Sequence, residues 1–391
     1  MPTNEYERKP KPDRPVIAVC YDFDKTLTPT DMQAQGYIQA VGYDVPDFWL
    51  ESNRLAEKND MDQNLAYMYK MIREAEGNLI FTRDTLEEYG SRVTLYPGVK
   101  EWFARIREYG ETLGVIVEHY IISSGLKEMI DGTSVAGEFE RIYASSFYYN
   151  ERGVAQWPAQ VVNYTNKTQF LFRIEKGVLD VNDPGVNEYF PPEDIRVPFR
   201  NMIYIGDSDT DIPCMKLVNA NGGHSIGVYD AETREKTKVY QMMRDGRIGY
   251  FAPADYREGS ELDTLVKTIV DRTAANERLV DISFRCREET ARADMDGDSE
   301  KRRQSELILS LKNSKSFAST HMLMKELRQI GSWSREDAEQ LFHIALTNGQ
   351  VRYILTDPDV SSFYESLLSD FGRRSEKARA VEKLIRPEKQ K

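Results

Sequence analysis

Cysteine is scarce in this chain, with three residues among 391. Cys20, Cys214 and Cys286 lie far apart and match neither a disulfide framework nor the short ligand spacings of a zinc site. Unpaired cysteines are typical of proteins from a reducing compartment. We therefore expect a cytoplasmic protein.

Long hydrophobic runs are also missing. No apolar stretch approaches the ~20 residues that a membrane-spanning helix needs. Residues 1–14 are polar, contain three prolines and lack the apolar core of a signal peptide. We expect no membrane association and a disordered lead-in at 1–14.

Positive charge is not in excess, since 52 Lys and Arg residues stand against 64 Asp and Glu residues and give a net charge of −12. This balance argues against nucleic acid as a main partner. The hydrophobic content of 40% and the charged content of 30% are those of a globular protein. A chain of 391 residues has room for two or three domains.

The first informative stretch is Asp22-Phe23-Asp24-Lys25-Thr26, which follows an apolar run at 16–21. The run is apolar on both faces, which predicts a strand buried in a parallel sheet. Asp22 and Asp24 then lie at the strand end, where open α/β sheets bind ligands. Two neighbouring carboxylates repel unless a cation lies between them, and a hard divalent metal prefers oxygen ligands. The alternative is a solvated acidic turn.

Small polar residues end a second predicted strand, at 117–122, which is followed by Ser123-Ser124-Gly125. A helix is expected to start at Leu126. Backbone N–H groups at a helix start, together with a hydroxyl, suit a phosphate oxygen. A plain serine N-cap is the alternative.

A lysine lies at another predicted helix start. Thr165-Asn166 is expected to cap a helix whose first turn contains Lys167. The helix dipole disfavours a cation there, so an anionic partner would explain Lys167. An exposed lysine is the alternative.

A last acidic group follows the predicted strand at 202–205, because Gly206-Asp207-Ser208-Asp209-Thr210-Asp211 holds three acids in five residues. Further strands are expected at 142–144 and 225–229, with a hairpin loop at 150–153. Strands that alternate with helices predict a doubly wound, Rossmann-like α/β sheet.

Two regions are predicted to be helical. Apolar residues recur at helical spacing within 29–95, and their Met and aromatic side chains are expected to form that insert's own core. From about Leu262 the pattern stays helical, and the charge-rich stretch before residue 304 suggests a linker or an exposed helix. The acidic run 294–298 suggests a calcium loop. We reject that loop, because with Gly297 as the loop glycine its first and last ligand positions are Arg292 and Arg303.

The expected domain organisation is therefore a lead-in at 1–14, an α/β core at 15–28 and 96–280, a helical insert at 29–95, a charged linker at 281–304, an all-helical domain at 305–371 and a basic tail at 372–391. The helical domain is expected to bind a protein partner or to self-associate.

Four polar motifs thus stand in a fixed order: Asp22-x-Asp24-x-Thr26, Ser124-Gly125, Lys167 and Gly206-Asp207-x-x-x-Asp211. This set resembles the haloacid dehalogenase superfamily, and within it the phosphoserine-phosphatase-like branch. A helical cap between the first and second motifs is that branch's arrangement, and the helical insert occupies this place. The resemblance covers roughly residues 15–275.

The resemblance implies roles for the four acids. It makes Asp22 the nucleophile that forms an aspartyl-phosphate. It makes Asp24 the acid that protonates the leaving oxygen and then the base that deprotonates water. It implies Mg²⁺ between the Asp22 carboxylate, the Asp24 backbone carbonyl and Asp207. Asp211 would orient the metal's water ligands or Lys167.

The same resemblance implies that Ser124, the Gly125 N–H and Lys167 hold the phosphoryl oxygens, with support from Thr26. Ser123 remains open as an alternative to Ser124. In the same way, Lys176 remains open as an alternative to Lys167.

The substrate is expected not to be phosphoserine. Phosphoserine phosphatases carry a Glu for the substrate amine where this chain has Asp31, which is shorter by a methylene. Ala66 stands where their carboxylate-binding Arg is expected, and Arg54, Arg73 or Arg83 would have to substitute for it.

The function that these features predict is a Mg²⁺-dependent phosphatase for a small phosphomonoester. Two alternatives keep the same site. One is a phosphotransferase with another acceptor, and the other is a phospho-ligand sensor that acts through the C-terminal helical domain.

Overall fold

The computed structural model describes residues 6, 8–192, 194–293, 299–314, 316–372 and 375–386. The chain divides into two compact units, Met1–Glu277 and Arg278–Lys391. No helix among the described residues is long and apolar enough to cross a membrane. Cys20 and Cys214 are buried, Cys286 is exposed, and all three are unpaired within the described ranges.

The first unit is built on one sheet, whose strands in the described part of the chain are ordered β4-β3-β2-β1-β5-β6-β7. Neighbouring strands are parallel, except that β4 is antiparallel to β3. This arrangement confirms the predicted doubly wound sheet, and β7 is a strand that the sequence did not predict. The strands are β1 Val16–Tyr21, β2 Ile116–Leu126, β3 Arg141–Tyr149, β4 Ala155–Gln160, β5 Met202–Gly206, β6 His224–Tyr229 and β7 Tyr250–Pro253.

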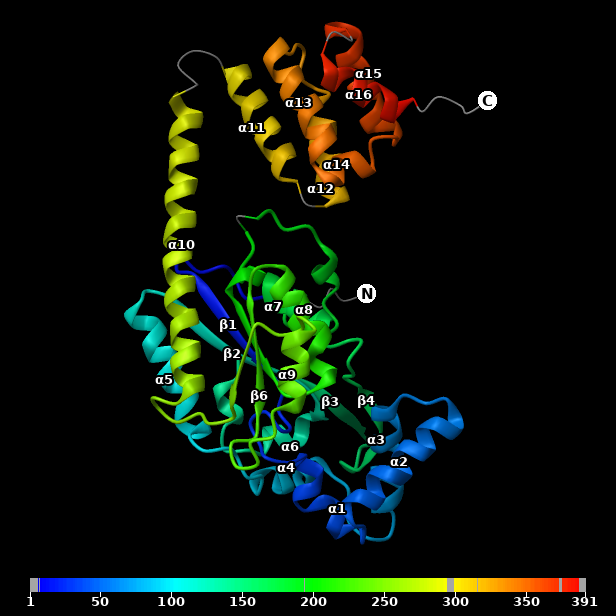
Figure 1. The fold of residues 1–391 in the computed structure, drawn as a ribbon. Helices are drawn as coiled ribbons and strands as arrows, with labels where there is room; N and C mark the ends of the chain where they lie inside the picture. The colour runs from blue at the N-terminus through cyan, green and yellow to red at the C-terminus, as the bar shows by residue number, and fades with distance from the viewer. Residues whose placement is uncertain are drawn as a thin grey trace. The chain divides into compact units, whose positions relative to one another are not determined.

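Helices cover both faces of this sheet (Figure 1). Alternate residues of β1 belong to two separate cores, with Val19 in one and Ala18 in the other. The Val19 core includes α5 and α10, and the Ala18 core includes α7, α8 and α9. Burial on both faces explains why the run is continuously apolar. These helices are α5 Val99–Thr112, α7 Thr168–Lys176, α8 Ile212–Ala220, α9 Thr237–Arg244 and α10 Glu261–Ala293.

The helical insert packs against the Val19 side of the sheet. Its Met68, Met71 and Phe48 side chains are fully buried, so they are core residues as predicted, but their core is shared with this face of the sheet and is not the insert's own. The helices of this region are α1 Tyr37–Ala40, α2 Val45–Asn59, α3 Gln63–Ala75 and α4 Arg83–Ser91.

Two predicted boundaries are wrong near the site. Strand β2 continues through the two serines to Leu126, with an irregular register after Ile122, and α6 Lys127–Asp131 begins only then. Helix α7 begins at Thr168, and Lys167 takes the N-cap position with no side-chain cap among the described residues. Asparagine turn chemistry before the helix, described below, replaces the predicted cap.

The second unit is helical. Its own core contains Leu311, Phe342 and Tyr364. The segment predicted as a basic tail contributes to this core, because Ala378 and Val381 are buried in it. The helices are α11 Ser299–Asn313, α12 Phe317–Leu327, α13 Arg335–Thr347, α14 Gly349–Tyr353, α15 Pro358–Phe371 and α16 Glu376–Ile385.

The predicted linker is partly helical, because α10 runs without a break to Ala293. The run 294–298, where the calcium loop was rejected, lies outside the described residues.

A buried ion pair predicts how stability responds to acid. Arg196 holds the Glu118 carboxylate of β2 through two contacts of 2.6 Å, and the Tyr120 hydroxyl donates to it at 2.6 Å. Burial raises the pKa of Glu118, but the Arg196 and Tyr120 hydrogen bonds outweigh burial and hold this pKa at about 2. A carboxyl group whose pKa is lower in the folded state stabilises the folded protein at pH values above its pKa in the unfolded state. This stabilisation is lost as the pH falls through the pKa of the folded state.

We expect about 3 kcal/mol of unfolding free energy to be lost between pH 5 and pH 2 through Glu118. The measurement is urea unfolding across that range, for the wild type and for Glu118→Gln. The variant should be less stable at pH 7 and should show a flatter dependence on pH. Parallel pH profiles for the two proteins would refute this assignment.

Candidate active site

The predicted acids meet at one edge of the sheet. Asp22 directly follows β1 and Asp207 directly follows β5, and these two strands are parallel neighbours. The Asp22 N–H donates to the Ile205 carbonyl at 3.0 Å, which fixes the first carboxylate beside the end of β5. The order of strands in the sheet changes direction at β1, because β2 and β5 flank β1 on opposite sides. Doubly wound folds bind ligands at this position.

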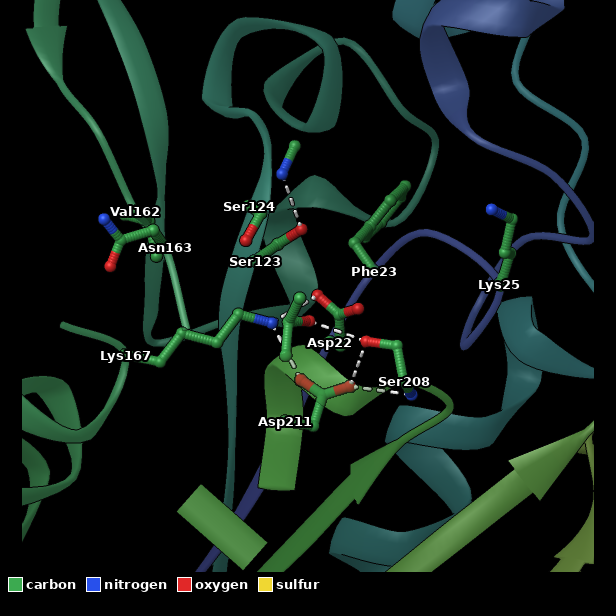
Figure 2. A network of polar contacts seen from close by, with 12 residues as sticks. Asp22, Phe23, Lys25, Ser123, Ser124, Val162, Asn163, Lys167, Ser208 and Asp211 are labelled. Carbon is green, nitrogen blue, oxygen red and sulfur yellow. Dashed lines mark hydrogen bonds and ion pairs between the residues drawn. The ribbon is translucent and has the colours of Figure 1, made fainter. Parts of the chain in front are cut away.

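Lys167 joins two of these acids. Its side chain is fully buried, and its Nζ lies 3.1 Å from Asp22 Oδ1 and 2.7 Å from Asp211 Oδ1 (Figure 2). A buried ammonium needs such partners, because desolvation disfavours its charge. The exposed-lysine alternative is therefore excluded. Lys176 donates instead to the backbone carbonyls of Val186 and Glu188, away from this cluster.

The Asp211 carboxylate is saturated with donors. In addition to Lys167, the Tyr204 hydroxyl donates to Oδ1 at 2.9 Å. The Ser208 N–H and hydroxyl donate to Oδ2 at 3.1 and 3.0 Å. Four donors occupy the acceptor sites of one carboxylate. Asp211 therefore anchors Lys167 and the loop after β5.

Crowded charge perturbs the remaining acids. Burial raises the pKa of Asp22 to about 6, even though the Lys167 charge lowers it. Burial and the charges of Asp211 and Asp22 raise the pKa of Asp207 to about 8. Burial lowers the pKa of Lys167, but the charges of Asp211 and Asp22 outweigh burial and hold it above its usual value.

This cluster has the chemistry of a divalent-cation site. Carboxylate oxygens of Asp22, Asp207 and Asp211 all lie within 4.8 Å of one another. Burial, together with repulsion between the acids, raises the pKa values of Asp22 and Asp207, and a bound cation would favour their ionised forms. An all-oxygen donor set fits Mg²⁺. Because Asp211 is saturated by other donors, Asp22 and Asp207 are the two carboxylates free to bind a cation directly.

Asp24 is held apart from this cluster. Its Oδ1 accepts the Met32 N–H at 2.7 Å, at the start of the helical insert. Its Oδ2 lies against the Gly125 backbone, because a methyl group on Gly125 would come within 2.8 Å of it. Burial, with the charges of Asp31 and Asp22, raises the pKa of Asp24 well above its usual value. A raised pKa favours the protonated form of this carboxyl group, which a proton donor needs.

The two serines differ in what they bind. Ser123 Oγ accepts the Gly125 N–H at 3.0 Å, so this N–H is engaged within the chain. Ser124 Oγ is buried and has no hydrogen-bond partner among the described residues. Its carbonyl accepts the Tyr67 hydroxyl at 2.8 Å. Ser124 therefore has the hydroxyl that remains open to a ligand.

Two further predicted residues lie at the edge of the cluster. Thr26 is fully buried, and its Oγ1 has no partner within the described ranges. The Tyr256 hydroxyl donates to its carbonyl at 2.8 Å. Asp31 pairs with Lys25 at 2.9 Å at the entrance to the helical insert, and its charge acts on Asp24. Ala66 is fully buried in α3.

Some site residues were not predicted. Ser208 could have been found, because Ser208-Asp209-Thr210-Asp211 spells a capping box, and the structure forms both of its bonds. Three more residues were not predicted. The Tyr204 hydroxyl donates to Asp211, the Tyr67 hydroxyl donates to the Ser124 carbonyl, and Asn163 accepts the Thr165 N–H. No local motif marks these three positions.

Known proteins resemble the chain over this region. The family model of haloacid dehalogenase-like hydrolases matches residues 19–216, about half of the chain. An uncharacterised protein of Borreliella burgdorferi is 25% identical over 275 residues, which is 63% of this chain and 94% of that protein.

Solved structures align with the chain at low sequence identity. A haloacid dehalogenase family hydrolase of Salmonella enterica serovar Typhi is 16% identical over 66% of this chain and 73% of its own, with a TM-score of 0.44. A phospho-aspartyl intermediate analogue of phosphoserine phosphatase is 13% identical over 65% and 99%, with a TM-score of 0.39.

Proposed function

The chain belongs to the haloacid dehalogenase-like hydrolases, and from this membership we propose that it is a Mg²⁺-dependent phosphatase acting on a small phosphomonoester. One observation carries the proposal. Lys167 is a fully buried cation held between Asp22 and Asp211, and the Asp207 carboxylate is the third acid of this cluster. A site with cations and unpartnered hydroxyls next to a nucleophile suits a phosphoryl group.

Asp22 is the proposed nucleophile. Its carboxylate oxygen attacks phosphorus, the ester P–O bond breaks, and an aspartyl-phosphate forms. Asp24 gives its proton to the departing alcohol oxygen, for which its raised pKa suits it. Asp24 then takes a proton from water, and this water attacks the aspartyl-phosphate to release inorganic phosphate and restore Asp22.

The phosphoryl oxygens need donors that are already in place. Lys167 offers its charge, and Ser124 and Thr26 offer hydroxyls without partners among the described residues. Asp211 keeps Lys167 in position through its 2.7 Å contact. Asp22, Asp207 and the Asp24 carbonyl would hold Mg²⁺, which would offset the repulsion between the nucleophile and the phosphate.

The proposed substrate excludes phosphoserine. Asp31, at the position of the amine-binding Glu, is already paired with Lys25. Ala66 offers no charge for a carboxylate. We place the enzyme in the cytoplasm on its unpaired cysteines, and we assign it a small soluble substrate.

The test is a panel of phosphomonoesters, including an aryl phosphate, assayed with Mg²⁺ and with EDTA. We expect hydrolysis with Mg²⁺ and a loss of about a hundredfold or more in EDTA, since the carboxylate repulsion would then be uncompensated. Added Mg²⁺ should restore the rate. Inactivity across the whole panel with Mg²⁺, or binding of a phosphoester without turnover, would refute the proposal.

A further inference from the structure

The start of α3 is bonded to the loop that leads into Lys167. We call residues 161–166 the lysine loop. Asn163 Nδ2 donates to Asp62 Oδ2 at 2.8 Å, and Asn64 Nδ2 donates to the Val162 carbonyl at 2.8 Å. The Asp62 side chain also caps α3, because Oδ1 accepts the N–H groups of Asn64 and Leu65. One carboxylate thus holds both the helix start and the lysine loop.

Asn163 also shapes the turn that ends at Lys167. Its Oδ1 accepts the Thr165 N–H at 3.0 Å and the Asn166 N–H at 3.2 Å. Its backbone carbonyl accepts the Lys167 N–H at 3.0 Å. The two ends of this one amide therefore have different tasks, since the oxygen shapes the turn before Lys167 and the nitrogen holds α3. Figure 2 shows Val162 and Asn163 beside the Lys167 side chain.

A second contact joins α3 to Ser124, near the end of β2. The Tyr67 hydroxyl donates to the Ser124 carbonyl at 2.8 Å. The Ser145 hydroxyl bridges the lysine loop and the end of β2, because it accepts the Val162 N–H at 3.0 Å and donates to the Ser124 carbonyl at 3.2 Å. Helix α3 therefore contacts both of the segments that carry the proposed phosphate-binding side chains.

We propose that Asn163 is a positioning residue that couples the docking of α3 to the placement of the Lys167 ammonium between Asp22 and Asp211. The inference rests on the proposed function for its effect on turnover. When α3 leaves the lysine loop to admit a substrate, the Asn163 amide and the Val162 carbonyl lose their partners. The turn before Lys167 then loosens, and docking restores it around the bound phosphate.

The chain offers a donor–acceptor swap to test this coupling. Asn163→Asp keeps the oxygen that the turn needs, but sets a carboxylate against Asp62 Oδ2. Asp62→Asn keeps an N-capping oxygen but removes the acceptor for Asn163. The double variant exchanges donor and acceptor and restores the bond. Asn150→Asp is the matched control, because Asn150 Oδ1 also accepts two backbone N–H groups, in the β3–β4 hairpin loop.

Two readouts are measured on the full chain. The first is kcat and KM for an aryl phosphate with Mg²⁺. We expect Asn163→Asp to lower kcat about tenfold or more, with a smaller change in KM, because a misplaced Lys167 acts on the transition state. The second is amide hydrogen exchange, which we expect to be about tenfold faster at 63–68 and 164–168 because undocking exposes these amides.

The double variant should return both quantities to within about threefold of the wild type, and Asn150→Asp should change neither. The inference is overturned if Asn163→Asp leaves either quantity within threefold of the wild type, or if the double variant is no better than Asn163→Asp. If the wild type hydrolyses no phosphomonoester, the proposed function fails while the exchange rates still decide the coupling.

Discussion

Replacing Asp22 by Asn is expected to lower kcat by about a thousandfold or more, because an amide cannot attack phosphorus to form the aspartyl-phosphate. The lost carboxylate is also one of the two proposed carboxylate ligands of Mg²⁺, and one of its oxygens lies within 4.8 Å of an oxygen of Asp207 and of Asp211. The measurement is steady-state hydrolysis of an aryl phosphate with Mg²⁺. The Asn side chain has nearly the same shape, so the fold should be retained.

The same change is expected to stabilise the metal-free protein at high pH. The pKa of Asp22 is raised to about 6, chiefly by burial, so the ionised form is disfavoured in the folded state. The contribution of such a group to the stability of the folded protein is fully present below its pKa in the unfolded state. It is lost as the pH rises through 6. Above pH 6, Asp22→Asn should therefore gain up to about 2 kcal/mol of unfolding free energy, and below pH 4 it should gain nothing.

The pH dependence of unfolding, the effect of Mg²⁺ and a control variant separate the role of the Asp22 carboxylate from a general effect of replacing an aspartate. Urea unfolding at pH 5 and pH 8 tests the pH dependence, and Mg²⁺ should raise the midpoint of the wild type more than that of Asp22→Asn. The control is Asp44→Asn, an exposed aspartate before α2 that makes no capping bond among the described side chains. Residual activity above a tenth of the wild type would show that Asp22 is not the nucleophile.

The parts of the site that were predictable are local in sequence. Asp22 and Asp24 follow directly on β1, and Asp207 follows directly on β5, so strand patterning alone placed them at the same edge. The buried strand and the layered α/β fold were predicted from continuous apolar runs. Such runs identify these strands because helices cover both faces of the sheet.

The parts that were not predictable depend on tertiary contacts. The Asn163–Asp62 bond joins residues 101 positions apart, and the Tyr67–Ser124 bond joins residues 57 apart. No periodicity or motif encodes such pairs, because they depend on how the helical insert docks against the sheet. The Lys167 helix start was mispredicted for a local reason, because Asn163 organises this turn from four residues upstream.

In the second unit, the basic composition of the C-terminal segment obscured the apolar residues with which it packs into the core. Residues 372–391 carry many Lys and Arg residues, and this composition suggested a solvated tail. Ala378 and Val381 nevertheless recur at helical spacing and are buried in the core of this unit. Basic side chains on one face of α16 do not prevent its apolar face from packing.

Lys167→Met is expected to destabilise the protein by about 3–5 kcal/mol, because removing one partner leaves buried carboxylates without their counter-charge. Lys167 contacts Asp22 at 3.1 Å and Asp211 at 2.7 Å, and its side chain is fully buried. Without the ammonium, the pKa of Asp22 should rise further, because the Lys167 charge lowers it. Carboxylates with raised pKa values stabilise only while protonated, so the deficit should be larger at pH 8 than at pH 5.

The activity of Lys167→Met is expected to fall about a hundredfold or more, since the proposed site then lacks its preorganised cation for the phosphoryl oxygens. Lys176→Met is the matched control, because this lysine lies at the other end of α7 and donates to two backbone carbonyls remote from the cluster. It should keep kcat within about threefold of the wild type and should show no greater loss of stability at pH 8 than at pH 5. Equal losses of activity in the two variants would contradict the role of Lys167. A stability deficit in Lys167→Met that does not grow with pH would contradict the electrostatic argument, because only ionised carboxylates need the ammonium.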